Sequence, residues 1–548
     1  MEHEYEYSST NTGNSFEKKE LFYKSLSRFS LKTRRFYGAQ NDKRYDQGVG
    51  GVPLAWQEED NSLYLDSSDA HTLIIGSTGS KKSRLVAIPT VKLLGYAGES
   101  LIISDPKAEI YNRTSKDLKL NGYDISVLNF RSPSESNAWN PLEIPYRFYC
   151  DDKIDKACEF VNDISVNLML SEMSTKDPFW DYSASDLFFG LTLLLFKFCK
   201  ENDKSFSSVN IGNLLRLRRE MFSKHTSTYS IENTDIWEYA KDDELIYSSL
   251  IGTVGAPDST QASILSTFDY KMRCFIIQPN LLNMLSSSNI ALSNIGARKT
   301  ALFLIMPDEK TSYHKLVALF IKQSYEYLIF KAQSLKNFSM PVRVNYLLDE
   351  FSSLPAIKDF SSMITAARSR NIRFNLIIQS KHQLIQRYGE EAETIQSNCT
   401  NWVFITSREL KLLDEISTLC GMRSNGNKPL ISVFALQRFN KEKGEILVLS
   451  GRLKPFKTQL PDIDKYDNGE FEIFPFPSIE SQNIEKIFSF KRNSISEPID
   501  SSKKVPIEKR KKIDNNSNNK ADDPLPYDVQ KELEAKFDEL FGTFNDDN

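Results

Sequence analysis

The sequence of 548 residues predicts an α/β fold, in which a mostly parallel sheet carries helices on both faces and is interrupted by an all-α insertion. Two observations predict this fold class. Short apolar runs closed by turn residues alternate with helical patterns in residues 46–147, and the alternation returns in residues 290–490. Residues 148–289 look mainly helical, and because strand patterns resume after them, we expect them to be inserted into one α/β domain.

Eight apolar runs are expected to form the strands of the sheet. They cover residues 71–76, 100–105, 124–130, 300–307, 343–350, 374–380, 402–406 and 444–451. A parallel strand is buried on both faces, so it is typically a near-continuous apolar run. Helical segments lie between most of the runs, as in residues 105–122 and 354–371, and this order predicts a doubly wound sheet.

The overall composition is that of a folded, soluble enzyme. Hydrophobic residues make up 40% and charged residues 26%, which excludes long-range disorder, collagen and coiled coils. The net charge of −4 points to no polyanionic partner, so only local charge can indicate one. The six cysteines form no C-x-x-C pair and the five histidines have no zinc-binding spacing, so we expect reduced thiols in a cytosolic protein.

The longest apolar stretch, residues 187–199, is expected to be a buried core helix rather than a membrane span. It is shorter than the roughly 20 residues that a span requires, and it contains Lys197. The amino-terminal residues are acidic and polar, unlike a signal peptide. If the protein works at a membrane, we therefore expect something else to hold it there.

A candidate phosphate-binding loop follows the first predicted strand of the sheet. It consists of Gly76, Ser77, Thr78, Gly79, Ser80, Lys81, Lys82 and Ser83. The pattern G-x-x-x-x-G-K-[ST] fits except that Lys81 takes the place of the second glycine. Backbone N–H groups of such a loop wrap phosphates, while Lys82 would neutralise phosphate oxygens and Ser83 would hold Mg²⁺. The lysine at position 81 therefore predicts slow hydrolysis. The alternative interpretation of residues 76–83 is an ordinary Gly/Ser turn that binds no phosphate.

Two further strand ends carry polar side chains suited to nucleotide hydrolysis. Asp349 and Glu350 end one apolar run, where Asp349 could orient the water shell of Mg²⁺ and Glu350 could polarise an attacking water. Gln379 follows another run and could sense a γ-phosphate. Arg368 or Arg370 could reach the nucleotide of a neighbouring subunit. The alternatives are a surface carboxylate pair, a helix cap and ordinary surface arginines.

Taken together, these motifs resemble those of the type IV secretion coupling proteins, the TraG-type conjugation ATPases. The resemblance runs from about residue 51 to residue 463. Its signatures are residues 76–83, 104–112, 136–143, 177–195 and 347–405, and the last of these is the most specific. The pair of transmembrane segments near the amino terminus that is typical of the family is expected to be missing.

The resemblance implies a RecA-like ATPase with an all-α domain, assembled as a homo-hexamer, that uses ATP and Mg²⁺. It implies that Lys82 and Ser83 are phosphate-loop residues, Asp349 and Glu350 the second nucleotide motif, Gln379 a sensor and Arg368 an arginine finger. Such proteins receive the relaxase–DNA complex and pass it to the secretion channel. The implied partners are single- or double-stranded DNA, relaxosome proteins, channel ATPases and a separate membrane protein that recruits this cytoplasmic chain.

The two ends of the chain differ in charge from the rest. Residues 1–45 are expected to form a basic amphipathic extension, in which Phe22, Leu26 and Phe29 make one apolar helical face. This face could bind an anionic membrane, a partner helix or nucleic acid, or pack on its own domain. Residues 491–548 are expected to be a flexible linker and an acidic tail, which could carry a short partner-binding helix.

Three functions compete at this point. The first is a motor that moves DNA, or a DNA–protein adduct, by ATP hydrolysis. The second is a nucleotide-gated receptor that recruits relaxosome proteins and hydrolyses ATP weakly, which Lys81 favours. The third is a general DNA translocase on the same fold, against which residues 104–112 and 347–405 argue.

Overall fold

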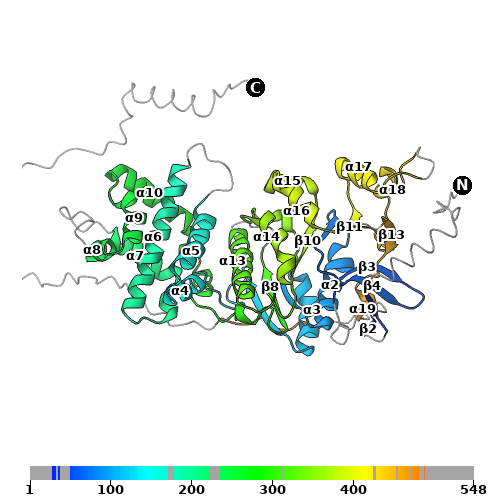
Figure 1. Cartoon of the computed structure of the whole chain (residues 1–548), viewed down its shortest axis with the longest axis horizontal. Coiled ribbons are helices and arrows are strands. Elements are labelled where there is room, and N and C mark those ends of the chain that lie inside the picture. Colours follow the sequence, from blue (N-terminus) through cyan, green and yellow to red (C-terminus); the bar gives the residue numbers. More distant parts are fainter. Residues whose placement is uncertain are drawn as a thin grey trace, which may run out of the picture. The chain divides into compact units, whose positions relative to one another are not determined.

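The computed structural model describes most of the chain between residues 27 and 487 (Figure 1). The described residues are 27–32, 35–37, 50–170, 178–222, 235–307, 309, 313–423, 428–451, 454–467, 472–479 and 487. The expectations for residues 1–26 and for the tail 491–548 lie outside this part of the chain.

A nine-stranded sheet organises the α/β part and contains all eight predicted strands. The strands are β5 (Thr72–Gly76), β6 (Ser100–Ser104), β7 (Asp124–Asn129), β8 (Thr300–Ile305), β9 (Val344–Leu348), β10 (Ile372–Ile378), β11 (Asn401–Thr406), β12 (Glu445–Ser450) and β13 (Phe456–Gln459). Their order is β13-β12-β11-β5-β10-β9-β6-β8-β7. The strands from β11 to β7 in this order pair in parallel, whereas β12 and β13 are antiparallel additions at one edge. The strand β13 was not predicted.

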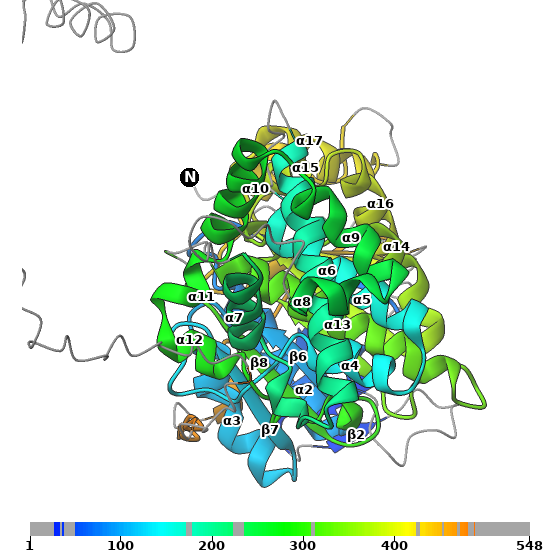
Figure 2. The same ribbon diagram turned by 90° about the vertical axis from the view of Figure 1, so that its left-hand side faces the viewer.

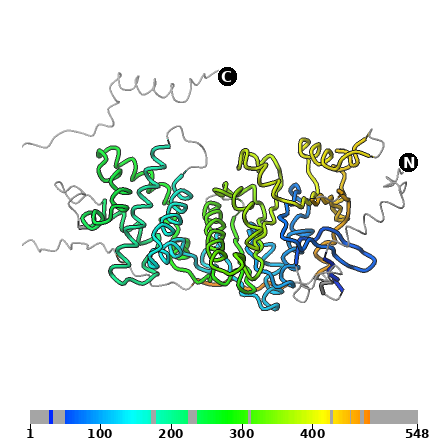
Figure 3. Tube along the Cα trace, in the orientation of Figure 1, coloured from blue at the N-terminus to red at the C-terminus, as the bar shows by residue number. Residues whose placement is uncertain are grey.

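Both faces of the sheet are covered, which explains why its central parallel strands are buried and mostly apolar. Side chains alternate between two cores, so that Leu73 and Ile75 pack into one and Ile74 into the other. The helices α2 (Ile88–Ala97) and α3 (Glu109–Leu120) contribute to the core of Ile74. The core on the other face includes residues of α13 (His314–Gln333) and α14 (Phe360–Ala367). Figure 3 traces how segments far apart in sequence meet in this sheet.

The described chain between β7 and β8 is helical. It contains α4 (Glu143–Cys150), α5 (Ile154–Met169), α6 (Phe179–Glu201), α7 (Ile211–Met221), α8 (Asp235–Lys241), α9 (Glu244–Val254), α10 (Asp258–Lys271), α11 (Arg273–Ile277) and α12 (Pro279–Met284). Helix α6 contacts α4, α5, α7, α9 and α10 (Figure 2). Among the described helices, α6 is long and apolar enough to cross a membrane, but 67% of its most apolar window is buried inside the protein. It therefore fits the expected core helix.

The prediction of a helix near Phe29 is wrong. The chain there forms β1 (Ser27–Ser30) and β2 (Arg35–Tyr37), which join β3 (Val52–Gln57) and β4 (Ser62–Asp66) in an antiparallel sheet of order β2-β1-β4-β3. Phe29 is 1% exposed and stacks on Tyr96 of α2. Strand pairing to β4 places Phe29 against its own domain, so this side chain offers no apolar face to a membrane.

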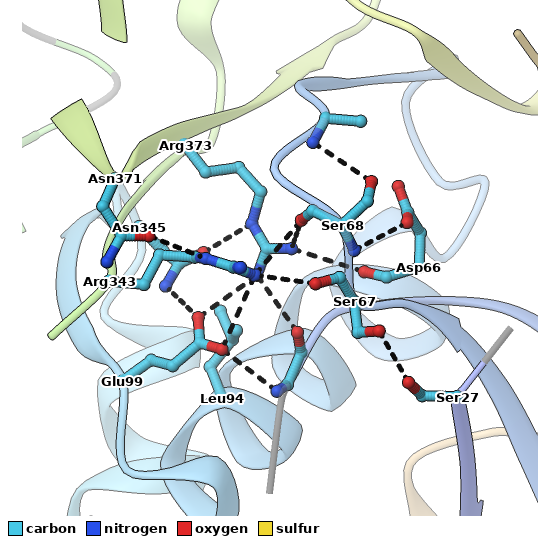
Figure 4. Close-up of polar contacts among 12 residues, drawn as sticks. Ser27, Asp66, Ser67, Ser68, Leu94, Glu99, Arg343, Asn345, Asn371 and Arg373 are labelled. Atoms are coloured by element: carbon cyan, nitrogen blue, oxygen red, sulfur yellow. Dashed lines mark hydrogen bonds and ion pairs between the residues drawn. The ribbon is translucent and has the colours of Figure 1, made fainter. Parts of the chain in front are cut away.

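A buried polar network holds the amino-terminal ends of the central strands (Figure 4). Arg373 in β10 donates to Asn345 Oδ1 in β9 at 2.7 Å and to the Ser68 carbonyl at 2.9 Å. Its guanidinium lies 3.3 Å from a carboxylate oxygen of Glu99, which precedes β6. Asn345 Nδ2 also donates to Glu99 at 2.7 Å. Since the charge and its partners are buried together, this network fixes the relative positions of β6, β9 and β10.

Candidate nucleotide-binding site

The predicted phosphate loop lies at the carboxyl end of β5, as the motif requires. Gly76 is the last residue of the strand, and the Ser77 N–H donates to the Thr406 carbonyl of β11 at 2.9 Å. A Cβ on Gly76 would lie 2.5 Å from Ser80 Oγ and 2.9 Å from Lys82 Cγ, so a larger residue would displace these two side chains. Gly79 has a φ of +73°, which glycine adopts without strain. The backbone is therefore folded into a tight loop at this edge of the sheet.

Lys82 points into the loop rather than into solvent. Its ammonium donates to the Gly76 carbonyl at 2.6 Å and lies 3.4 Å from the Ser77 carbonyl. Burial lowers the pKa of Lys82, and the nearby carboxylates of Glu350 and Asp349 act in the opposite direction. The positive charge is thus held inside the loop and close to the two predicted carboxylates.

Carboxyl groups crowd the neighbouring strand ends. Asp349 follows β9 and is 8% exposed, while Asp105 follows β6 and is 1% exposed. Burial, with the charges of Glu350 and Asp105, raises the pKa of Asp349 to about 7 against the opposing effect of Lys82. Burial likewise raises the pKa of Asp105 to about 7. Asp105 was not among the predicted site residues, although it follows the end of a strand as Asp349 does.

A hydrogen-bonded relay joins the phosphate loop to Glu350. Thr78 Oγ1 donates to Gln379 Oε1 at 2.8 Å, and Gln379 Nε2 donates to both carboxylate oxygens of Glu350 at 2.6 Å. Glu350 has a φ of +54°, a left-handed conformation that costs a residue with a side chain about 1–3 kcal/mol. The strands β5, β10 and β9 are neighbours in the sheet, which brings Thr78 and Gln379 together although they are 301 positions apart in sequence.

Ser80 and Ser83 stand where the loop enters the following helix. The first turn, Ser83–Ala87, is wound as a π-helix and continues into α2. Ser80 Oγ is buried with no hydrogen-bond partner among the described residues. An unpaired buried hydroxyl beside folded loop amides is the kind of group that a phosphate oxygen would satisfy. The loop therefore fits a phosphate ligand.

Lys81 adopts a left-handed conformation with a φ of +66°, the conformation for which the motif normally uses glycine. Such a conformation costs a residue with a Cβ about 1–2 kcal/mol. The Lys81 ammonium pairs with Glu442 and lies 3.8 Å from Asp462. The substitution therefore leaves the backbone path of the loop intact.

In the described part of the chain, protein side chains alone do not form a metal site. Within the described ranges, no three His, Cys, Asp or Glu side chains are grouped so that they could hold a metal ion. Mg²⁺ is usually held by one or two protein oxygens together with phosphate oxygens and water. Ser83 and Asp349 thus suit a cation that arrives with a nucleotide.

The predicted arginines do not join this group. Arg368 donates to Asp69 at 3.0 Å, three residues before β5 begins, and its side chain is 44% exposed. Arg370 also precedes β10, and its guanidinium lies 3.4 Å from Ser369 Oγ. Both arginines are at the amino-terminal edge of the sheet, opposite the phosphate loop. Within one chain neither can act on the loop, so a role at a nucleotide requires a second subunit.

Curated relatives resemble this chain over about two thirds of its length. It is 23% identical over 372 residues to the probable conjugal transfer protein TraG of Sinorhizobium fredii, covering 66% of this chain and 54% of the relative. It is 23% identical over 370 residues to the protein VirD4 of Rhizobium radiobacter, covering 66% and 49%. The chain thus spans about half the length of the curated relatives it matches.

The fold matches solved structures of the bacterial conjugative coupling protein TrwB. The unbound monoclinic form gives a TM-score of 0.52 at 14% identity, covering 78% of this chain and 91% of that chain. The complex of TrwB with ADP and Mg²⁺ gives a TM-score of 0.50 at 15% identity, covering 76% and 89%. The predicted RecA-like α/β fold with an all-α insertion is therefore confirmed.

A family profile shows to which protein family the chain belongs. The profile described as type IV secretory system conjugative DNA transfer matches residues 18–428, well over half of the sequence. The match includes the phosphate loop, the inserted helices and the segment around Asp349 and Glu350. The chain belongs to the type IV secretory system conjugative DNA transfer family.

Proposed function

We propose that this chain is the coupling protein of a conjugative type IV secretion system, and that it binds ATP, recruits a relaxase–DNA complex and drives DNA into the channel by hydrolysis. The observation that carries the proposal is the meeting of the loop Gly76–Ser83 with Asp349, Glu350 and Gln379 at one edge of the sheet. Membership of the conjugative DNA transfer family and the fold shared with TrwB, solved with ADP and Mg²⁺, support it.

The phosphate loop would hold the triphosphate. Backbone N–H groups of the loop after Ser77, whose own N–H is bonded to Thr406, would bind phosphate oxygens, and the start of the following helix would add partial positive charge. Lys82, already buried beside the Gly76 carbonyl, would transfer its hydrogen bonds to phosphate oxygens. Ser83 would ligate Mg²⁺, while Asp349 would bind water molecules of its coordination shell. When bound, ATP supplies the anhydride bond whose hydrolysis powers transfer.

Glu350 would orient and polarise the attacking water. In the structure its carboxylate is occupied by Gln379, which is in turn held by Thr78. A phosphate bound in the loop would compete for the amide of Gln379 and free Glu350 to accept a hydrogen bond from water. Gln379 would in this way link the filling of the loop to the activation of Glu350.

Assembly would complete the site. We propose a homo-hexamer in which Arg368 of one subunit approaches the nucleotide of its neighbour, because its place at the opposite edge of the sheet excludes a role within the same chain. The partners would be single- or double-stranded DNA, relaxosome proteins and the channel ATPases. A separate membrane protein would recruit the chain from the cytoplasm to the cell membrane. We further propose that the helices between β7 and β8 act as one all-α domain.

A second function is favoured by one observation. Lys81 occupies the glycine position of the loop, so hydrolysis could be slow enough for the protein to act as a nucleotide-gated receptor for the relaxosome. A general DNA translocase is a weaker alternative. The receptor and the motor differ in whether hydrolysis is needed for transfer, and this difference can be measured.

The test compares wild type with Lys82→Ala and Glu350→Gln in ATP hydrolysis with single-stranded DNA and in conjugative transfer. The proposal expects DNA-stimulated hydrolysis in wild type only, and loss of transfer in both variants. Absence of hydrolysis in wild type with DNA and partner proteins, together with transfer that survives Glu350→Gln, would favour the receptor. Glu159→Gln, which removes an exposed ion pair with Lys156 on α5, is the matched control.

A further inference from the structure

Charged side chains from two distant segments surround the exposed side of the phosphate loop. We call the contacts of Lys441, Glu442 and Asp462 with this loop the clasp. Glu442 pairs with Lys81, and Lys441 Nζ donates to the Gly79 carbonyl at 3.2 Å. Asp462 lies 3.8 Å from the Lys81 ammonium and also pairs with Arg84 on the following turn. Gly79 and Lys81 are thus tied to the segments that precede β12 and follow β13.

Hydrogen bonds hold in place the segments that carry Glu442 and Asp462. The side chain of Asn440 accepts hydrogen bonds from the N–H groups of Glu442 and Lys443 at 2.9 and 3.2 Å. The Asn440 N–H donates to Glu445 at the start of β12 at 2.8 Å, and the Leu460 N–H after β13 donates to Gly444 at 2.9 Å. Glu442 is therefore presented on a hydrogen-bonded turn, which reduces the entropy lost when it pairs with Lys81.

Lys81 needs such an anchor more than a glycine would. Its φ of +66° lies in the region that residues with a Cβ rarely adopt, and an untethered lysine would favour other conformations. Any other conformation at this position would move the amide of Lys82, which is adjacent, and the cation that Lys82 presents. In the structure the left-handed backbone and the ion pair with Glu442 occur together, so a change of backbone that carries the Lys81 ammonium away from Glu442 breaks the pair.

We propose that Glu442 and Asp462 are positioning residues of the nucleotide site, which hold Lys81 in the left-handed conformation and so preserve a phosphate-binding loop that lacks its second glycine. This inference rests on the proposed ATP-binding function. It makes a specific claim about coupling: Glu442 matters to the loop only while residue 81 carries a side chain.

The first test uses hydrogen–deuterium exchange of residues 77–83 in the full-length chain without nucleotide. Glu442→Gln should speed exchange of this segment about fivefold, with no change in melting temperature, because only local opening becomes easier. In a Lys81→Gly background the same substitution should change exchange less than about twofold. Glu442→Asp should restore most of the protection, and Glu159→Gln should have no effect. Equal acceleration in both backgrounds, or none in either, overturns the proposal.

The second test measures ATP binding with Mg²⁺ by titration calorimetry in four chains: wild type, Glu442→Gln, Lys81→Gly and the double variant. Glu442→Gln should raise the dissociation constant about fivefold in the presence of Lys81 and leave it unchanged in the Lys81→Gly background. If all four chains bind ATP with the same dissociation constant, the proposed role of Glu442 is overturned and the proposed ATP-binding function is not. A failure of wild type and Lys81→Gly to bind ATP overturns the proposed function instead.

Discussion

The two ends of the central strands carry opposite kinds of polar chemistry. At the amino-terminal ends of β6, β9 and β10, Arg373 and Arg343 converge on Glu99, and every charge has an opposite charge nearby (Figure 4). At the carboxyl ends of the same strands, Asp105 and Asp349 are buried beside Glu350, with Lys82 as the compensating cation described above. The same sheet therefore ends in a network of hydrogen bonds and opposite charges on one side and in crowded like charges on the other.

The difference indicates which end is structural and which end is prepared for a ligand. Buried polar groups that satisfy one another fix a fold and leave nothing for a ligand to bind. Buried carboxylates that repel one another, with an unpaired serine hydroxyl nearby, are stabilised when a cation and a phosphate arrive. Burial alone does not separate these two regions, because Arg373 and Asp105 are both 1% exposed.

Removing the cation of the amino-terminal network should have the largest effect on stability. Arg373→Met leaves Glu99 buried without its main partner, so we expect the free energy of unfolding to fall by about 3–5 kcal/mol. Urea denaturation of wild type and variant measures this change. Arg298→Met, which removes an exposed pair with Asp124, should change stability by less than about 1 kcal/mol. An equally small effect of Arg373→Met would mean that the network is not structural.

Removing the proposed general base should affect catalysis and spare stability. Glu350→Gln keeps the shape of the side chain but cannot accept a proton, so DNA-stimulated ATP hydrolysis should fall by about 10²-fold or more. The dissociation constant for ATP and the melting temperature should stay close to the wild-type values. A large loss of ATP affinity would place Glu350 in ground-state binding rather than in activation of water.

Relieving the crowding at the carboxyl ends should stabilise the protein without ligand. The pKa of Asp349 and that of Asp105 are about 7 in the folded chain, above the unfolded value of 3.8. Between these values the folded state binds more protons than the unfolded state, so the free energy of unfolding should fall as pH rises from about 4 to about 7. Asp349→Asn should flatten this dependence and raise stability at pH 7.5 by about 1–3 kcal/mol.

Thermal unfolding of the ligand-free chain across pH 4 to 8 measures this effect. His71 titrates in the opposite sense, because burial lowers its pKa to about 4, so the comparison is made between wild type and Asp349→Asn rather than from one curve. Stability of Asp349→Asn equal to that of wild type at pH 7.5 would show that the carboxyl ends hold no electrostatic strain.

The smallest change expected concerns the loop itself. Lys81→Gly removes the strain of a left-handed lysine, about 1–2 kcal/mol, and also the ion pair that offsets it. We therefore expect a change in unfolding free energy of less than about 1 kcal/mol. If the lysine at this position limits hydrolysis, the same substitution should raise the rate of ATP turnover. Steady-state kinetics of the two chains measure the turnover. An unchanged rate would show that lysine does not limit hydrolysis at this position.

The sequence was sufficient for the parts of the fold that depend on local pattern. The predicted strands were correct because parallel strands buried on both faces are continuous apolar runs. The helix near Phe29 was wrong because Phe29 pairs in β1 with β4, a contact between separate segments that the spacing i, i+4, i+7 does not reveal. Residues 17–26 of that segment lie outside the described part of the chain.

The candidate site could be predicted only as separate motifs. Strand order decides which of them meet, and that order places Gln379 between Thr78 and Glu350. The partner of Lys81 lies 361 residues away in sequence, in a turn with no motif of its own, so no local pattern could identify Glu442. The same holds for the pairing of Arg373 with Glu99, 274 residues apart.

The central claim is that the loop Gly76–Ser83 and the carboxylates Asp349 and Glu350 face one nucleotide. A structure of the chain with a non-hydrolysable ATP analogue and Mg²⁺ tests it most directly. The account predicts phosphate oxygens within hydrogen-bond distance of Lys82 and a magnesium ion bound to Ser83, with Asp349 on its water ligands. A nucleotide bound elsewhere would contradict it. So would a structure at saturating ligand in which Lys82 still donates to the Gly76 carbonyl and no phosphate occupies the loop.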